Sequence, residues 1–156
     1  MHDLASLILE GAVNSMEAGA DLIDIKIDKR SAFVDVQIQD NGILLESGKW
    51  FDLGVSSKGE ERGKGLFLIK SIDKNASLEK KDGFTTLRFQ AFDDESIDAF
   101  DQLLFPIFQL PLAISVCYTI DGRVAFEMKK NKGEEPVRAS QIARFKNFVR
   151  MKIRSV

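Results

Sequence analysis

Two segments near the start of the chain alternate strictly between apolar and polar residues. They cover residues 21–28 and 33–40, and a short polar turn joins them. The apolar positions are Ile23, Ile25 and Ile27 in the first segment and Val34, Val36 and Ile38 in the second. Such alternation is typical of paired strands with one buried face. Because the phase of the second segment continues to its end, it also places Asp40 on the buried face, where a carboxylate is costly without hydrogen-bond partners.

Apolar residues at helical spacing predict a helix over residues 3–18. Asp3 can cap its N-terminus, and Gly19 suits the left-handed position after its end. The predicted apolar stripe consists of Ala5, Ile8, Leu9, Ala12, Val13 and Met16. Glu10 and Asn14 lie four residues apart on the opposite face, so their side chains can share a small site. A solvated helix face is the alternative interpretation of this pair.

The remaining pattern predicts two hairpins and four further helices. The hairpins cover residues 76–92 and 113–129, with Asp-Gly turns at 82–83 and 121–122. The helices cover residues 44–52, 65–74, 96–105 and 136–153. In the second helix Leu66, Ile69 and Ile72 are expected to face the core, and Pro106 and Pro111 bracket a connector after the third. The last helix is rich in Lys and Arg, which either complement its dipole or form a docking surface for an acidic partner.

A glycine-rich stretch runs directly into one of these helices. The polar loop of residues 53–62 leads into Gly63, Lys64 and Gly65, and Leu66 begins the apolar run. The first N–H groups of a helix lack intrahelical partners and the helix dipole is positive there, so a glycine-rich helix start can hold a polyphosphate. A glycine-rich turn without a ligand is the alternative, since one G-x-G is a weak signal.

Two interpretations also remain open for Asp40. Asn41 and Gly42 break the strand directly after it, so its carboxylate can bond the turn amides in an Asx-turn. The other interpretation is a buried acceptor for the amino group of a ligand. The residues alone do not decide between the two.

Composition narrows the class of protein. The chain has 156 residues, 44% of them hydrophobic, and a net charge of −2, which is typical of one globular domain, or one with an appendage, and gives no case for nucleic acid. Cys117 is the only cysteine, so neither an internal disulfide nor a cysteine-cluster metal site is expected. The sequence has neither an apolar run of about 18 residues nor a signal-peptide pattern at its start. We therefore expect a cytoplasmic protein without a membrane span.

The order of these motifs resembles the GHKL (histidine kinase-like) ATPase superfamily. Its members include the ATP-binding domains of gyrase, mismatch-repair ATPases, ninety-kilodalton heat-shock chaperones and sensor histidine kinases. The matching motifs are Glu10-x-x-x-Asn14, Asp40-x-Gly42, Ser56-Ser57-Lys58 in the loop, and Gly63-Lys64-Gly65-Leu66 at the helix start. The resemblance covers residues 3–92. It implies an α+β fold, a two-layer sandwich with helices on one face of a mixed, mostly antiparallel sheet.

The resemblance also implies a role for each residue near the base and the metal. Asn14 would ligate Mg²⁺ through its amide oxygen. Asp40 would accept a hydrogen bond from the adenine amino group, and Gly42 would let the base approach closely. Glu10 would orient or deprotonate the attacking water, or the acceptor hydroxyl in a kinase.

The phosphates would be held by the loop and the helix start. Backbone amides of Gly63, Lys64 and Gly65, ahead of Leu66, would bind them. Lys58 and Ser57 would reach the γ-phosphate from the loop, which would act as a lid. The sequence departs from the family at Leu44, where a second glycine is usual, and this puts that side of the pocket in doubt.

Three hypotheses for the function follow. The first is ATP binding with Mg²⁺ and slow hydrolysis or protein phosphorylation in a regulatory role. The second is a degenerate, non-catalytic module for nucleotide sensing or protein interaction, and the third, nucleic-acid binding, rests on the basic helix alone. His2 is the only histidine and no dimerising helical pair surrounds it, which disfavours phosphorylation of an internal histidine. We expect an ATP-binding domain over residues 1–92 and an extension of unknown function over residues 93–156. We also expect a protein partner, and the sequence leaves open whether the protein forms a homodimer.

Overall fold

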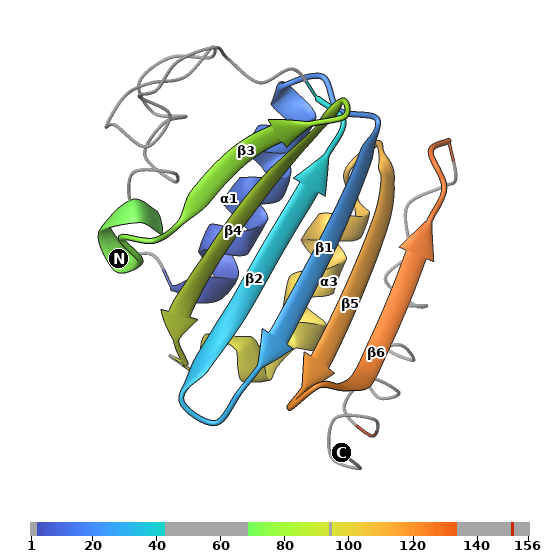
Figure 1. The fold of residues 1–156 in the computed structure, drawn as a ribbon. Coiled ribbons are helices and arrows are strands. Elements are labelled where there is room, and N and C mark those ends of the chain that lie inside the picture. The colour runs from blue at the N-terminus through green and yellow to red at the C-terminus, as the bar shows by residue number, and fades with distance from the viewer. Residues whose placement is uncertain (1–2, 43–68, 94, 134–150, 152–156) are drawn as a thin grey trace.

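Over the residues that the structure describes, the fold is a six-stranded sheet with its helices on one face (Figure 1). The computed structural model describes residues 3–42, 69–93, 95–133 and 151. The strand order is β3-β4-β2-β1-β5-β6, and all neighbours are antiparallel except β1 and β5. The predicted fold class, a two-layer α+β sandwich with a mixed, mostly antiparallel sheet, is confirmed.

The two alternating segments form adjacent strands in the middle of the sheet. They are β1 (Leu22–Lys29) and β2 (Phe33–Asp40), which pair antiparallel. Every second residue of β2 is buried, and this phase runs unbroken to Asp40. The inward orientation of Asp40 that the alternation predicted is therefore confirmed.

The predicted first helix is α1 (Leu4–Glu17), and both its ends are capped as the sequence indicated. The Asp3 side chain accepts a hydrogen bond from the Ser6 amide at 2.8 Å. Gly19 has φ of +85°, and the amides of Gly19 and Ala20 donate to the carbonyls of Met16 and Ser15. This pair of bonds is the Schellman motif, which needs a left-handed residue at this position.

The predicted apolar stripe of α1 is wrong in its rotation about the helix axis. The buried residues are Leu4, Leu7, Ile8, Gly11, Ala12 and Ser15. Ala5, Leu9 and Met16 are only half-buried and pack at the margin of the core. The apolar pattern does not show this face, because the helix lies on the sheet through Gly11 and Ser15, whose small size allows close approach.

Both predicted hairpins form. They are β3 (Ser77–Lys81) with β4 (Phe84–Phe92), and β5 (Ala113–Ile120) with β6 (Arg123–Lys130). Each turn consists of an Asp and a Gly that both have positive φ, which is the type I′ geometry that Asp-Gly favours. β5 also pairs parallel with β1, so strands beyond residue 92 continue the sheet of the preceding segment.

The helix after β4 extends past the residue expected to end it. A 3-10 turn, η2 (Ser96–Ala99), leads into α3 (Phe100–Phe108), which contains Pro106. Proline removes one helical hydrogen bond, but the apolar residues around it hold the turn in place. Those that are buried are Leu103, Leu104, Ile107 and Phe108. The prediction that Pro106 lies in a connector is therefore wrong.

Residues 69–72 are helical, as predicted, but their burial differs from expectation. Ile69 is 1% exposed, whereas Ile72 is 48% exposed, so the expectation that Ile72 faces the core is wrong. Asp73 directly after them ends the helix and accepts from the Asn75 and Gln90 amides. Within the described ranges, no helix is long and apolar enough to cross a membrane.

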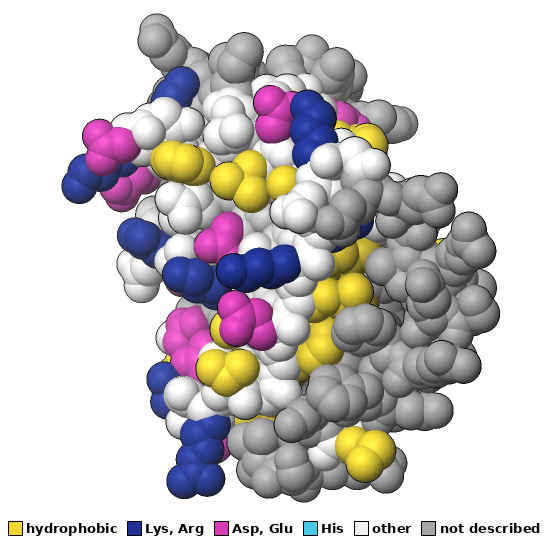
Figure 2. Space-filling view, turned by 90° about the vertical axis from the view of Figure 1, so that its right-hand side faces the viewer, with side chains coloured by type: hydrophobic (Ala, Val, Ile, Leu, Met, Phe, Trp, Pro, Cys, Tyr) yellow, Lys and Arg dark blue, Asp and Glu magenta, His cyan; other side chains and the backbone are white. Residues whose placement is uncertain are grey.

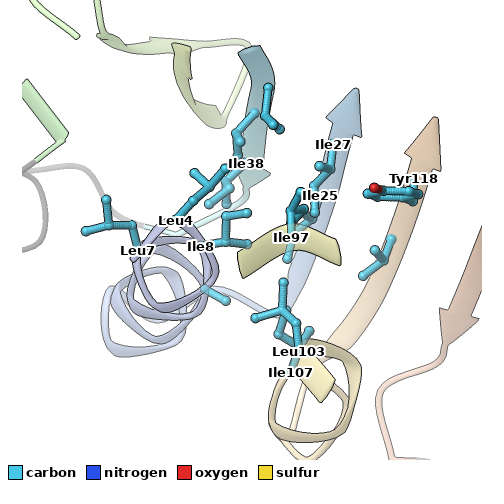
Figure 3. Close-up of a cluster of buried hydrophobic side chains, with 14 of the residues drawn as sticks. Leu4, Leu7, Ile8, Ile25, Ile27, Ile38, Ile97, Leu103, Ile107 and Tyr118 are labelled. Atoms are coloured by element: carbon cyan, nitrogen blue, oxygen red, sulfur yellow. The ribbon is translucent and has the colours of Figure 1, made fainter. Parts of the chain in front are cut away.

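The core fills the space between the helices and the sheet (Figure 3). Leu4 and Ile8 of α1 point toward the inward side chains of β1 and β2 (Figure 3). Leu103 and Ile107 extend this layer from α3, and Tyr118 extends it on β5. The packing holds α1 against the sheet, and α1 carries two of the predicted site residues.

Strands β3 and β6 form the two edges of the sheet within the described part of the chain. β3 has only five residues, three of them charged. β6 carries an irregularity in its pairing opposite Tyr118 and Thr119. On the face of the molecule that Figure 2 shows, basic and acidic side chains are interspersed. Short, charged or bulged edge strands disfavour pairing with other chains.

Lys130, at the end of β6, is buried, with 6% of its surface exposed. Its Nζ donates to the carbonyl of Phe108 at 3.1 Å and to that of Leu110 at 2.5 Å. These carbonyls lie at the C-terminal end of α3, where the helix dipole favours a cation. Lys130 thus joins the last strand to the end of this helix.

Replacing Lys130 with methionine is expected to lower the free energy of unfolding by about 1–3 kcal/mol, because buried carbonyls lose their donor. Lys132 offers a matched control, since its ion pair with Asp21 is more than half exposed. Lys132→Met is expected to cost less than about 1 kcal/mol. Urea unfolding of both variants measures the difference, and equal effects would contradict a capping role for Lys130.

Candidate functional site

Asp40 is a buried carboxylate with hydrogen bonds on both oxygens. It is 7% exposed at the end of β2. Its Oδ1 accepts from the Gly42 amide at 2.8 Å, and its Oδ2 accepts from the Ser15 hydroxyl at 2.6 Å. The first bond forms the Asx-turn, which was one of the two interpretations of Asp40 that the sequence allowed. The second comes from α1 and was not predicted.

The Asx-turn does not use up the capacity of this carboxylate. Each carboxylate oxygen has two lone pairs and can accept two hydrogen bonds. One protein donor reaches each oxygen in the described part of the chain. Asp40 therefore combines the turn with spare acceptor capacity, so the two interpretations of this residue are compatible.

Thr85 lies directly across from Asp40 on β4 and adds a second polar group. It is 6% exposed, and its Oγ1 is buried without a hydrogen-bond partner among the described residues. A buried hydroxyl without a partner is costly, so a ligand or water that bonds it would gain affinity. Sequence reasoning missed Thr85. The same kind of alternation runs along β4 and places Thr85 on the inward face together with Leu87 and Phe89.

A side chain at Gly42 would fit only tightly. A Cβ atom there would lie 3.1 Å from the Cβ and the carbonyl oxygen of Ala18 and from Oδ1 of Asp40. The glycine thus allows the end of α1 to lie close to the end of β2, and a side chain would require a shift of a few tenths of an ångström there. Its predicted role beside a base is a further reason for glycine and remains a prediction.

Asn41 holds the strand ends around the site together. Its Oδ1 accepts from the amides of Asp21 at 2.7 Å and Leu22 at 3.1 Å. Those amides begin β1, whereas Asn41 directly follows β2. The side chain therefore fixes the loop after α1 against the segment that carries Asp40 and Gly42, a role that sequence reasoning missed.

Glu10 and Asn14 both lie on α1 and are half-buried. Asn14 directly precedes Ser15, whose hydroxyl donates to Asp40, so it occupies the neighbouring position on the same helix. In the described ranges its side chain has no hydrogen bond. Helix α1 therefore carries Asn14, the predicted metal ligand. It also carries Ser15, which bonds Asp40, the residue predicted to bind the adenine base.

The rest of the predicted site lies outside the described residues. This part includes the loop 53–62 and Leu44. The site residues concerned are Ser57, Lys58, Gly63, Lys64, Gly65 and Leu66. The predicted helices over 44–52 and 136–153 also lie there, apart from Met151. The phosphate-binding half of the site therefore remains a prediction.

The opposite face of the sheet carries a hollow of about 530 Å³. Its polar side chains bond one another across the strands: Arg88 Nε donates to Gln37 at 3.1 Å and Gln90 Nε2 donates to Asp35 at 2.9 Å. Cys117 also lines it, and burial, with the nearby Glu127 carboxylate, raises the pKa of this thiol above its usual value of 9.0. A thiol that stays protonated at neutral pH is a poor nucleophile.

Solved structures resemble this fold. One, described as the N-terminal domain of a DNA repair protein, superposes with a TM-score of 0.63 at 16% identity, over 86% of this chain and 54% of that one. The MutL ATPase domain of Aquifex aeolicus, complexed with ADP, matches with a TM-score of 0.49 at 14% identity, over 92% and 70% of the two chains. The sequence matches no protein-family model and no curated protein.

The chain spans about half the length of the first of these structures. At such identities, the likeness bears on the fold alone. The motif order in the sequence predicted a mixed sheet with helices on one face. The observed strand order and the likeness to the DNA repair domain agree with this prediction. The chain therefore shares its two-layer α+β fold with this DNA repair domain, and the fold agrees with the one that the resemblance to the GHKL ATPase superfamily implied.

Proposed function

We propose that this protein binds ATP with Mg²⁺ and uses it in slow hydrolysis or in phosphorylation of a protein. The observation that carries the proposal is the buried pair at the ends of β2 and β4. Asp40 has spare acceptor capacity, and the Thr85 hydroxyl beside it lacks a partner in the described residues. An acceptor and a hydroxyl side by side match the amino group and ring nitrogen on one edge of adenine.

The residues present fit the base. Asp40 would accept from the exocyclic amino group, and Thr85 would donate to the neighbouring ring nitrogen directly or through water. Ser15 and the Gly42 amide keep the carboxylate in place while it does so. A 6-oxo purine would present an acceptor to Asp40, and two facing acceptors repel.

Asn14 and Glu10 would act at the other end of the nucleotide. Asn14 would offer its amide oxygen to Mg²⁺, a ligand type that this cation prefers. Bound Mg²⁺ neutralises charge on the phosphates. Glu10, one helical turn before Asn14, would orient the attacking water or hydroxyl and accept its proton. Ser57, Lys58, Gly63, Lys64, Gly65 and Leu66 complete the proposal as phosphate ligands on the strength of the sequence alone.

A non-catalytic module is the second candidate, and one observation favours it. Both oxygens of Asp40 already accept hydrogen bonds within the chain, so the buried carboxylate has a structural use without a ligand. In this case the fold would serve nucleotide sensing or protein interaction. A protein partner, a homodimer and a cytoplasmic location are further proposals that rest on the sequence.

Calorimetric titration with ATP, with and without Mg²⁺, tests the proposal, and a phosphate-release assay on the same sample tests turnover. Asn14→Ala is expected to weaken ATP binding in Mg²⁺ by about tenfold or more, because the cation loses a ligand, and to change binding in EDTA little. Asn75→Ala, at an exposed asparagine on the edge of the sheet, is the matched control. Absence of ATP binding by the unchanged protein would overturn the proposal.

A further inference from the structure

Helix α1 lies on strand β2 through two contacts that are one helical turn apart. Gly11 faces Ile38, and Ser15 faces Asp40. The two helix residues are four positions apart, a rise of about 6 Å, and the two strand residues are two positions apart on one face, a rise of about 6.7 Å. Because the two spacings nearly match, the helix can contact the strand at both points at once.

The first contact sets the height of the helix above the sheet. A Cβ atom on Gly11 would lie 2.6 Å from Cδ1 of Ile38, closer than real carbon atoms approach. This atom is the far end of a flexible side chain, but Ile38 is 1% exposed, so a shift of its methyl group takes place among packed neighbours. A side chain at position 11 would therefore require either a rearrangement of Ile38 within the core or an outward shift of α1.

The second contact sets the orientation of the Asp40 carboxylate. Ser15 is 6% exposed, and its Oγ lies 2.6 Å from Oδ2 of Asp40 and 3.1 Å from the Gly11 carbonyl oxygen. The shorter contact goes to the charged group, where hydrogen bonds are stronger. The last torsion of an aspartate side chain is soft. Ser15 and the Gly42 amide therefore fix the plane of the carboxylate from two different elements.

We propose that Gly11 and Ser15 are positioning residues, which hold Asp40 in one fixed arrangement with Glu10 and Asn14. Gly11 directly follows Glu10, and Ser15 directly follows Asn14. A shift of α1 at either contact therefore moves Asn14, the proposed metal ligand, and Glu10, the proposed general base, relative to the Asp40 carboxylate that would bind adenine. This inference rests on the proposed ATP-binding function. It adds the residues that keep the base-binding Asp40 on β2 aligned with Glu10 and Asn14 on α1.

Nucleotide preference is the readout that a merely structural role would not change. Ser15→Ala is titrated with ATP and with GTP, which carries an oxygen in place of the 6-amino group. ATP affinity is expected to fall about tenfold, because the carboxylate loses one of the two donors that hold it in the orientation for the amino group, while the weaker GTP affinity stays the same. The preference for ATP therefore narrows. Ser15→Thr keeps the hydroxyl and is expected to keep the preference.

A second pair of variants tests the other contact without touching a polar group. Gly11→Ala is expected to lower ATP affinity in Mg²⁺ by about tenfold through displacement of Asn14. Ile38→Val removes the methyl group that the new Cβ would meet, so the double variant is expected to recover most of the loss. Ile38→Val alone is the control.

The outcomes separate this inference from the function on which it rests. Ser15→Ala with the unchanged ATP-to-GTP preference, or Gly11→Ala with unchanged affinity, overturns the positioning role while ATP binding stands. Loss in Gly11→Ala that Ile38→Val does not recover also overturns it. An unchanged protein that binds neither nucleotide overturns both.

Discussion

Replacing Asp40 with asparagine is expected to weaken ATP binding by about a hundredfold or more, because a buried charged acceptor is lost. The carboxylate faces the Ser15 hydroxyl, the Gly42 amide and the proposed adenine amino group, all of which are donors. Asparagine has only one acceptor oxygen, and its own amide group would point a donor at one of these donors. Calorimetry with ATP and Mg²⁺ measures the loss.

The matched control for this change lies on the same strand. Asp35 is on the opposite face of β2, where it accepts from the Gln90 side chain at 2.9 Å. Asp35→Asn is expected to bind ATP as the unchanged protein does. Urea unfolding of Asp40→Asn shows how much stability the turn contributes, with a loss of about 1–3 kcal/mol expected. A folded Asp40→Asn variant with full ATP affinity would remove the main support for the proposed base site.

Glu10→Gln is expected to reduce ATP turnover by about 10²–10⁴-fold while ATP affinity changes little, because an amide of nearly the same shape cannot accept the proton. Phosphate release measures turnover, and calorimetry on the same sample measures binding. Glu79→Gln, at an exposed position on β3, serves as the control and is expected to leave both quantities unchanged.

Two results would revise the role of Glu10 in different ways. Turnover that persists in Glu10→Gln would mean that another group orients the nucleophile. ATP binding without measurable turnover in the unchanged protein would instead favour the nucleotide-sensing alternative, since the site would then hold ATP without using it.

The sequence predicted those parts of the fold that depend on local pattern. Alternation in β1 and β2 fixed which residues face the core, and the inward phase of Asp40 followed from it. The Asp-Gly turns and the capping residues Asp3 and Gly19 act through their immediate neighbours, so they too could be predicted.

Features that depend on distant contacts could not be predicted in this way. The sequence shows Ser15 only as a polar residue within a predicted helix. Its burial and its hydrogen bond to Asp40 depend on the position of β2 in the folded protein. Pro106 normally ends a helix, but packing of its apolar neighbours outweighs one lost hydrogen bond. The burial of Ile69 and the exposure of Ile72 depend on which side of a short helix meets the core.

The parallel pairing of β1 with β5 has a consequence for the order in which the molecule assembles. Leu22 lies beside Ala113, so a central strand made early in synthesis gains its second neighbour only after a long further stretch has been translated. Contacts between residues so distant in sequence slow folding, because a large loop must close before they form. A nascent chain ending near residue 92 would still expose one backbone edge of β1, and this unpaired edge could pair with other chains until β5 emerges.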